Sequence, residues 1–114
     1  MSSSTSEFVI KRGDLEPPIT ATIKDATGAV VNLTGATSPV LILKPIAGGS
    51  AQRLSTGTTL LDATNGRIRH AWQSGETTTA GSYFAEWEVS WPTSRPQTFP
   101  TEGTFMVVVE QDQG

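Results

Sequence analysis

The sequence contains no cysteine, and this absence removes several kinds of chemistry at once. Without thiols the chain cannot form disulfides, hold zinc through thiolates or use a cysteine nucleophile. A chain without disulfides also fits assembly in a reducing cytoplasm.

Charge and long apolar runs are scarce as well. Charged residues make up only 17% of the chain, and no apolar run approaches the roughly 20 residues that a membrane helix needs. The N-terminus lacks the basic and apolar regions of a signal peptide. The net charge is −3, and Arg67 with Arg69 is the nearest approach to a basic cluster, which is too little for a typical nucleic-acid binder. We therefore expect neither nucleic acid nor membrane as a partner.

Thr, Ser and Gly fill the space that charged and apolar residues leave, and this composition favours strands joined by tight turns. No segment keeps apolar residues at helical spacing, whereas residues 19–24 and 82–91 alternate with a period of two. In the second segment Tyr83, Ala85, Trp87, Val89 and Trp91 share one face. Residues 40–43 and 104–110 are apolar on both faces, which is typical of central strands. The sequence therefore predicts an all-β fold.

Strand and turn signals recur at roughly the 8–12-residue spacing of a β-sandwich. The expected strands are 8–12, 19–24, 29–33, 40–43, 51–55, 59–61, 67–72, 82–91 and 104–110. Asn65-Gly66 predicts a type I′ hairpin turn, and three prolines predict a loop over 92–101. We expect an immunoglobulin-like antiparallel β-sandwich of about seven to nine strands over residues 8–111, preceded by a flexible Ser/Thr-rich arm over 1–7.

Few residues offer chemistry. His70 is the only histidine, and it falls on the core-side face of its strand, where a hydrogen-bonded structural role is expected. Glu86 and Glu88 share one strand face at a spacing that glycosidases use, but alternating acids are also typical of a solvated face. Asp62 with Asn65 lacks the ligand pattern of a calcium loop. We predict no catalytic residues, no metal and no cofactor, and therefore no enzyme.

The aromatic residues carry two further hypotheses. Trp87 shares its face with aliphatic residues, which predicts core packing, whereas Trp91 at the strand end can be exposed and Trp72 ends another strand. Exposed tryptophans would allow a carbohydrate-binding module that contacts a host glycan. Tyr83 opens the longest strand, where a tyrosine corner would bond its hydroxyl to the backbone upstream.

Several short motifs follow one another along most of the chain. They are Phe8-Val9-Ile10-Lys11-Arg12-Gly13-Asp14, Pro18 before the strand to Lys24, Asp25-Ala26-Thr27-Gly28, Val31-Asn32-Leu33-Thr34-Gly35-Ala36, Asp62-Ala63-Thr64-Asn65-Gly66, Trp72, Gly75-Glu76-Thr77, and Ala80-Gly81-Ser82-Tyr83 leading to Glu86. In this order and spacing the chain resembles the N-terminal domain family of phage baseplate upper proteins.

The resemblance implies an immunoglobulin-like fold and a structural role in a virion, assembled in the host bacterial cytoplasm. Its partners would be other virion proteins, contacted in several symmetric copies as an adaptor of the tail or baseplate. A capsid decoration (cement or head-fibre) protein is the alternative. In the family this domain precedes stem and receptor regions, whereas this sequence stops at Gly114. The aromatic residues and the acidic strand have no family role to carry over, so we name no binding site from the family.

Overall fold

A computed structural model describes residues 5–25, 27–93, 95–100 and 104–111 of the chain. These residues form strands and turns, with no helix and hence no segment that could cross a membrane as one. The strands are β1 (Thr5–Lys11), β2 (Ile19–Thr22), β3 (Thr37–Pro45), β4 (Gln52–Leu54), β5 (Thr58–Asp62), β6 (Arg67–His70), β7 (Gly81–Trp91), β8 (Arg95–Pro100) and β9 (Thr104–Glu110).

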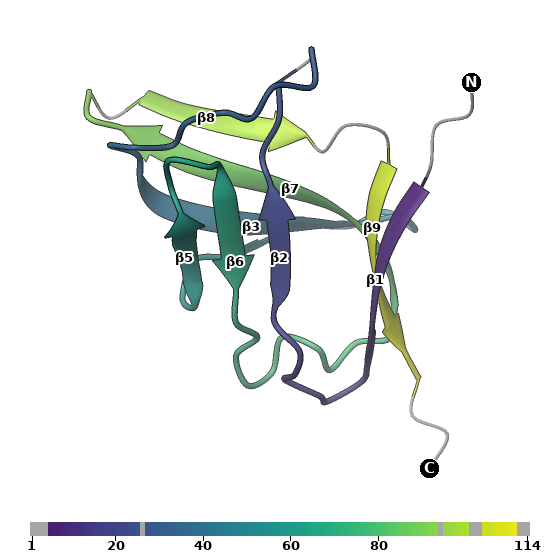
Figure 1. The fold of residues 1–114 in the computed structure, drawn as a ribbon. Coiled ribbons are helices and arrows are strands. Elements are labelled where there is room, and N and C mark those ends of the chain that lie inside the picture. Colours follow the sequence, from purple (N-terminus) through teal and green to yellow (C-terminus); the bar gives the residue numbers. More distant parts are fainter. Residues whose placement is uncertain (1–4, 26, 94, 101–103, 112–114) are drawn as a thin grey trace.

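The strands form two sheets, as Figure 1 shows. The larger sheet has six strands in the order β1-β9-β7-β3-β4, with β8 also paired to β7. The smaller sheet has the order β2-β6-β5. The order β2-β6-β5 corresponds to strands B, E and D of immunoglobulin-like sandwiches, and β9-β7-β3-β4 corresponds to strands G, F, C and C′ of the facing sheet. The predicted fold class is therefore confirmed.

One pairing differs from the predicted antiparallel arrangement. β1 runs parallel to β9 along its whole length, so the larger sheet is mixed. The first and last strands are joined through the whole domain and not by a hairpin, so nothing in their connection forces them to run in opposite directions. β1 also begins at Thr5, and it therefore includes part of the predicted arm, while residues 1–4 lie outside the described residues.

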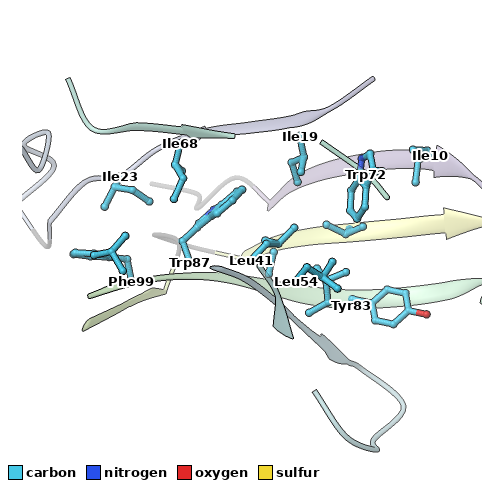
Figure 2. Packing of buried hydrophobic residues seen from close by; sticks show 14 of the residues in the cluster. Ile10, Ile19, Ile23, Leu41, Leu54, Ile68, Trp72, Tyr83, Trp87 and Phe99 are labelled. Atoms are coloured by element: carbon cyan, nitrogen blue, oxygen red, sulfur yellow. The ribbon is translucent and has the colours of Figure 1, made fainter. Parts of the chain in front are cut away.

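The core lies between the sheets and is built from the alternating faces that the sequence predicts. Trp87 and Leu41 of the larger sheet and Ile19 and Ile68 of the smaller one have 1% or less of their surface exposed. Figure 2 shows the Trp87 ring reaching from β7 toward Ile68 on the opposite sheet. At roughly 25 cal/mol per Å² of buried apolar surface, this layer provides the main stabilisation of a chain without disulfides.

The prediction of a loop over residues 92–101 is wrong, because β8 occupies most of that stretch. β8 pairs with β7 from Trp91↔Arg95 to Glu86↔Pro100. The partner of β7 changes to β9 nearer its start, so among the described strands β8 has a neighbour on one side only. An edge strand tolerates proline when the missing N–H would point to solvent, and Pro96 and Pro100 have the even spacing that this requires.

The connection between β5 and β6 also differs from its prediction. Asn65 N donates to the carbonyl of Asp62 and Gly66 N to that of Ala63, both at 3.1 Å, so two consecutive turns replace a two-residue hairpin. A type I′ turn needs positive φ at two residues, but here Gly66 has φ +68° and Asn65 is not in that region. The predicted strand over 29–33 is reduced to a single bridge between Lys24 and Val30.

Gly66 is irreplaceable for two reasons, and alanine at this position is expected to cost about 2–3 kcal/mol of unfolding free energy. A Cβ at Gly66 would lie 2.6 Å from the carbonyl oxygen of Val31. The backbone φ of +68° at this position is also one that residues with side chains rarely adopt. Gly28→Ala is the matched control, because Gly28 has φ +88° but open space around it. Urea denaturation of both variants should show the larger loss for Gly66→Ala, and equal losses would contradict the close approach.

The predicted tyrosine corner is present. The Tyr83 hydroxyl donates to the carbonyl oxygen of Thr79 at 2.8 Å, while the ring is buried in the core. A second tie closes the same end of the sandwich, because Gly13 N donates to the Thr77 carbonyl at 2.9 Å and the Thr77 hydroxyl donates to the Asp14 carbonyl at 2.8 Å. These bonds fix the segment before β7 against the segment after β1.

Candidate interaction surface

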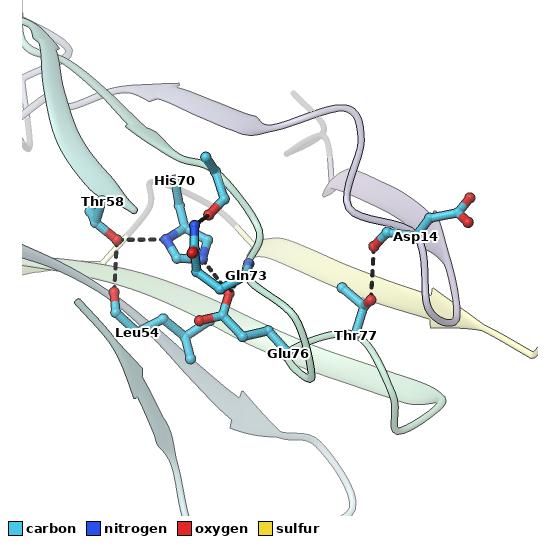
Figure 3. Close-up of polar contacts among 8 residues, drawn as sticks. Asp14, Leu54, Thr58, His70, Gln73, Glu76 and Thr77 are labelled. Atoms are coloured by element: carbon cyan, nitrogen blue, oxygen red, sulfur yellow. Dashed lines mark hydrogen bonds and ion pairs between the residues drawn. The ribbon is translucent and has the colours of Figure 1, made fainter. Parts of the chain in front are cut away.

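His70 is fully buried and both of its ring nitrogens are occupied (Figure 3). Nδ1 lies 2.6 Å from the Thr58 hydroxyl, and Nε2 lies 2.7 Å from Oε1 of Glu76. The Thr58 hydroxyl also donates to the Leu54 carbonyl at 2.7 Å, and the main-chain N–H of Gln73 donates to Glu76 Oε1 at 2.9 Å. The ring therefore joins β6 to β5 and to the segment that follows β6.

The protons of this cluster can be assigned from its acceptors. The single Thr58 proton is directed to the Leu54 carbonyl, so the hydroxyl oxygen accepts from Nδ1–H. The other ring nitrogen, Nε2, contacts Glu76 Oε1, so His70 is a buried hydrogen-bonded cross-link in the fold. The ring has no exposed surface and two polar partners, which is the hydrogen-bonded environment that the sequence predicts for His70.

Glu86 and Glu88 share the outer face of the larger sheet, and each is paired with a cation. Lys44 Nζ lies 3.0 Å from Glu86 Oε1, and both guanidinium nitrogens of Arg53 contact the Glu88 carboxylate. The hydrogen bond from Arg53 holds the pKa of Glu88 below its ordinary value and raises the pKa of Arg53. The two carboxylates are thus members of separate ion pairs, not an acid–base couple.

Acid should weaken the fold by protonating the carboxylates of Glu88 and Asp25. Like Glu88, Asp25 has a lowered pKa, because its side chain accepts first from the Thr27 hydroxyl and then from the amides of Ala29 and Thr27. A carboxyl whose pKa is lower in the folded chain stabilises it above the unfolded pKa, and this contribution is lost as pH falls through the folded value. The unfolding free energy should therefore decline below the ordinary Glu and Asp values of 4.5 and 3.8.

Urea titrations between neutral pH and about pH 3 would measure this decline. The double variant Asp25→Asn, Glu88→Gln keeps side chains of similar shape without the titrating groups, and it should lose less stability on acidification than the wild type. Parallel curves for the two proteins would contradict the assignment.

Asp62 and Asn65 bind each other. Asn65 Nδ2 donates to Asp62 Oδ2 at 2.9 Å, inside the turn already described. The described residues include no group of three or more His, Asp or Glu side chains placed to hold a metal. Arg67 and Arg69 lie on the outer face of the smaller sheet, and their cross-strand neighbours are threonines and one aspartate: Thr20, Thr22, Thr59 and Asp62.

The three tryptophans do not form an exposed platform. Trp72 and Trp87 are buried, and Trp72 packs edge-on against the His70 ring at 5.1 Å between centroids. Trp91 is half-buried, and its indole N–H donates to Gln97 Oε1 at 2.8 Å. It lines a hollow of about 380 Å³ at the β7–β8 hairpin together with Arg95, and this is the one place where a tryptophan meets solvent in the described chain.

The outer face of the larger sheet has two unlike halves. In one half the Lys44–Glu86 and Arg53–Glu88 pairs lie beside Val40 and Ile42, which have only 7% of their surface exposed. The sequence predicts that residues 40–43, which lie in β3, are covered on both faces. The inner face is covered by the core, and the outer face is covered by charged side chains of the same sheet. Long charged side chains shield apolar neighbours with their methylene stems.

The other half carries an uncovered apolar patch, which we call the outer-face patch: Val9, Phe84, Met106 and Val108. Val9 is 46% exposed and Phe84 43% exposed, while Met106 and Val108 are half-buried. The register places Val9 beside Val108 and Phe84 beside Met106, so the residues are contiguous across β1, β9 and β7. Contiguous exposed apolar side chains of this kind mark sites of protein contact more than single exposed ones do.

The sequence contains a signal for this patch that the strand assignment did not use. Phe84 lies between Tyr83 and Ala85, so the alternation that buries those two residues must turn Phe84 outward, next to Glu86. A second hollow, of about 510 Å³, lies at the start of β7 and is lined by Ile46, Ser82 and Tyr83 among others.

No family model matches this chain. No curated protein matches it either.

Proposed function

We propose that this domain is a non-enzymatic structural component of a phage particle, in the tail or baseplate, and that it binds neighbouring virion proteins through the outer-face patch. The observation that carries the binding role is the contrast within one sheet face. One half is shielded by two ion pairs, while the other presents Val9 and Phe84 to solvent without such cover. An unshielded apolar area is costly in water and is stabilised when a partner covers it.

The assignment to a phage particle is supported by the resemblance of the sequence motifs. These motifs also contact one another in pairs. Gly13-Asp14 bonds to Thr77, and the segment 31–33 bonds to the segment 62–66 through Leu33 N to the Ala63 carbonyl at 2.8 Å. Motifs that are mutually bonded depend on one another, so their joint order carries more weight than each short match alone. They support a shared scaffold, and the virion role is what the resemblance implies.

The residues with catalytic potential support a non-enzymatic role because each has a structural partner. His70 is held by Thr58 and Glu76, and the two strand glutamates by Lys44 and Arg53. A general acid or base must reach the proton that it transfers. The geometry therefore favours binding over turnover.

Purified particles of the phage that encodes the chain provide the test. Mass spectrometry should find the protein in the particles, and electron microscopy should place it on the tail or baseplate. The variant Phe84→Thr, Val108→Thr should fold but be incorporated much less. Leu61→Thr is the matched control, because Leu61 is 40% exposed on β5, away from the patch. Particles that lack the protein would refute the virion role, and normal incorporation of the patch variant would refute the binding surface.

A further inference from the structure

The free edges of the two sheets differ in how well they resist pairing with another strand. β8 carries Pro96 and Pro100, β4 has three residues, β2 has four, and the register of β5 shifts before its end. β1 has seven residues, no proline and a regular register throughout. It lies at one end of the larger sheet, where β9 is the only described strand beside it (Figure 1). Prolines, short strands and bulges each protect an edge, and β1 has none of these three, while its charged residues Glu7 and Lys11 are of opposite sign.

The main-chain groups of β1 can be divided between its two sides. The Arg12 amide donates to Glu110 of β9 at 2.8 Å, and in a parallel ladder alternate residues bond to the same neighbour. Phe8 and Ile10 therefore point their N–H and C=O groups at β9, while Glu7, Val9 and Lys11 point theirs at the free edge. The Lys11 carbonyl fits this division, because it accepts from Asp14 N at 3.0 Å and not from β9.

The side chains at the free-edge positions form a self-complementary set. Glu7, Val9 and Lys11 all lie on the outer face of the sheet, with an acid, an apolar residue and a base in that order. If a second β1 runs antiparallel with Val9 opposite Val9, Glu7 of each copy faces Lys11 of the other. The two Val9 residues then exchange N–H···O bonds, and each Lys11 N–H reaches the Glu7 carbonyl of the other copy. Opposite charges directly across a strand pair are stabilising.

We propose that two copies of this chain associate through antiparallel β1–β1 pairing about a two-fold axis at Val9, which joins their six-stranded sheets edge to edge. The pairing brings Val9 and the neighbouring Val108 of both copies together, so the two outer-face patches become one. An isologous contact of this kind closes at a dimer. One strand edge buries less than the roughly 1,200 Å² of a standard interface, so we expect a weak dimer that assembles at high local concentration.

Charge exchange at the two polar positions tests the pairing. Lys11→Glu places two carboxylates opposite each other at both ends of the paired strands, and Glu7→Lys places two lysines together in the same way. Each variant should raise the dimer dissociation constant at least about tenfold in sedimentation equilibrium, measured from about 10 μM to 1 mM chain. A mixture of the two variants should form a heterodimer with wild-type affinity, because each acid again meets a base. Lys24→Glu, which changes an exposed lysine outside β1, is the matched control.

Backbone substitution tests the edge itself. Val9→Pro removes the N–H that pairing needs, while that N–H bonds nothing in the described fold, so the variant should stay folded and become monomeric. Val9→Thr keeps the N–H and should still dimerise. Amide exchange supplies an independent readout that needs no variant. The Val9 and Lys11 amides should gain protection as concentration rises, whereas the Ile10 amide should be protected at all concentrations.

A chain that stays monomeric at about 1 mM would overturn the proposal. A dimer that survives both Lys11→Glu and Val9→Pro would also overturn it, and so would a failure of the mixed charge variants to associate. If Val9→Pro does not fold, the charge exchange and the amide protection decide the question. The dimer is independent of the virion role, because particles can contain the protein as a monomer and the dimer can form in the absence of any other phage protein.

Discussion

Replacing Glu76 with alanine is expected to lower the unfolding free energy by about 3–4 kcal/mol, because it leaves the buried His70 Nε2 and the Gln73 main-chain N–H without their shared partner. The Glu76 carboxylate receives His70 Nε2 at 2.7 Å and the Gln73 amide at 2.9 Å, and the His70 ring has no exposed surface. The His70 ring cannot turn to water without moving the core. The loss would be measured by urea denaturation at neutral pH.

Glu86→Ala is the control for this prediction, since Glu86 is also a paired glutamate but lies on the outer face beside an exposed lysine. Surface ion pairs contribute about 0–1 kcal/mol, so the control should be nearly neutral. If the two variants lose equal stability, the buried cluster is not the cross-link that its geometry indicates.

The sequence predicted the faces of the strands better than their pairing. The alternation in β7 placed Tyr83, Ala85 and Trp87 in the core correctly, and it placed Glu86 and Glu88 outside. Burial follows from a period-two pattern that depends on the strand alone. The parallel run of β1 beside β9 depends on how the entire chain between them is routed, and no local pattern contains that information.

Two of the errors in local structure share a cause. Prolines at positions 96 and 100 exclude a central strand but not an edge strand, and only the change of partner along β7 makes that edge available. The Asn-Gly pair at 65–66 favours a tight hairpin, but the carbonyl of Val31 and the side chain of Val30 pack against Gly66 from another segment and select a longer turn. Tertiary neighbours decided both cases.

The outer-face patch was harder to foresee than the core. Phe84 alternates outward in a pattern that the sequence shows, but its exposure depends on whether charged neighbours cover it as they cover Val40 and Ile42. Cover depends on which strand lies alongside, so it requires the sheet order. The His70–Glu76 contact is similar, since a spacing of six residues predicts nothing without the turn that brings them together.

Trp87→Ala should be the most damaging single substitution in the core, with an expected loss of about 3–5 kcal/mol. The indole is fully buried and spans the space between the sheets, where Figure 2 shows it among Ile23, Ile68 and Leu41. Removing it leaves a cavity bounded by strands of both sheets, which hydrogen-bond ladders hold apart. The sandwich cannot collapse onto the space without breaking those ladders, so the cavity cost adds to the lost burial.

Trp87→Phe separates the volume of this side chain from its polarity. The indole N–H has no hydrogen-bond acceptor among the described residues, so phenylalanine gives up no polar contact there and should cost only about 1–2 kcal/mol. Trp91→Ala serves as the comparison at the half-buried end of the same strand, and a smaller loss than for Trp87→Ala is expected. The packing of Trp87 is expected to hold the two sheets together. If Trp91→Ala lowers the unfolding free energy as much as Trp87→Ala or more, the centre of the sandwich lies elsewhere.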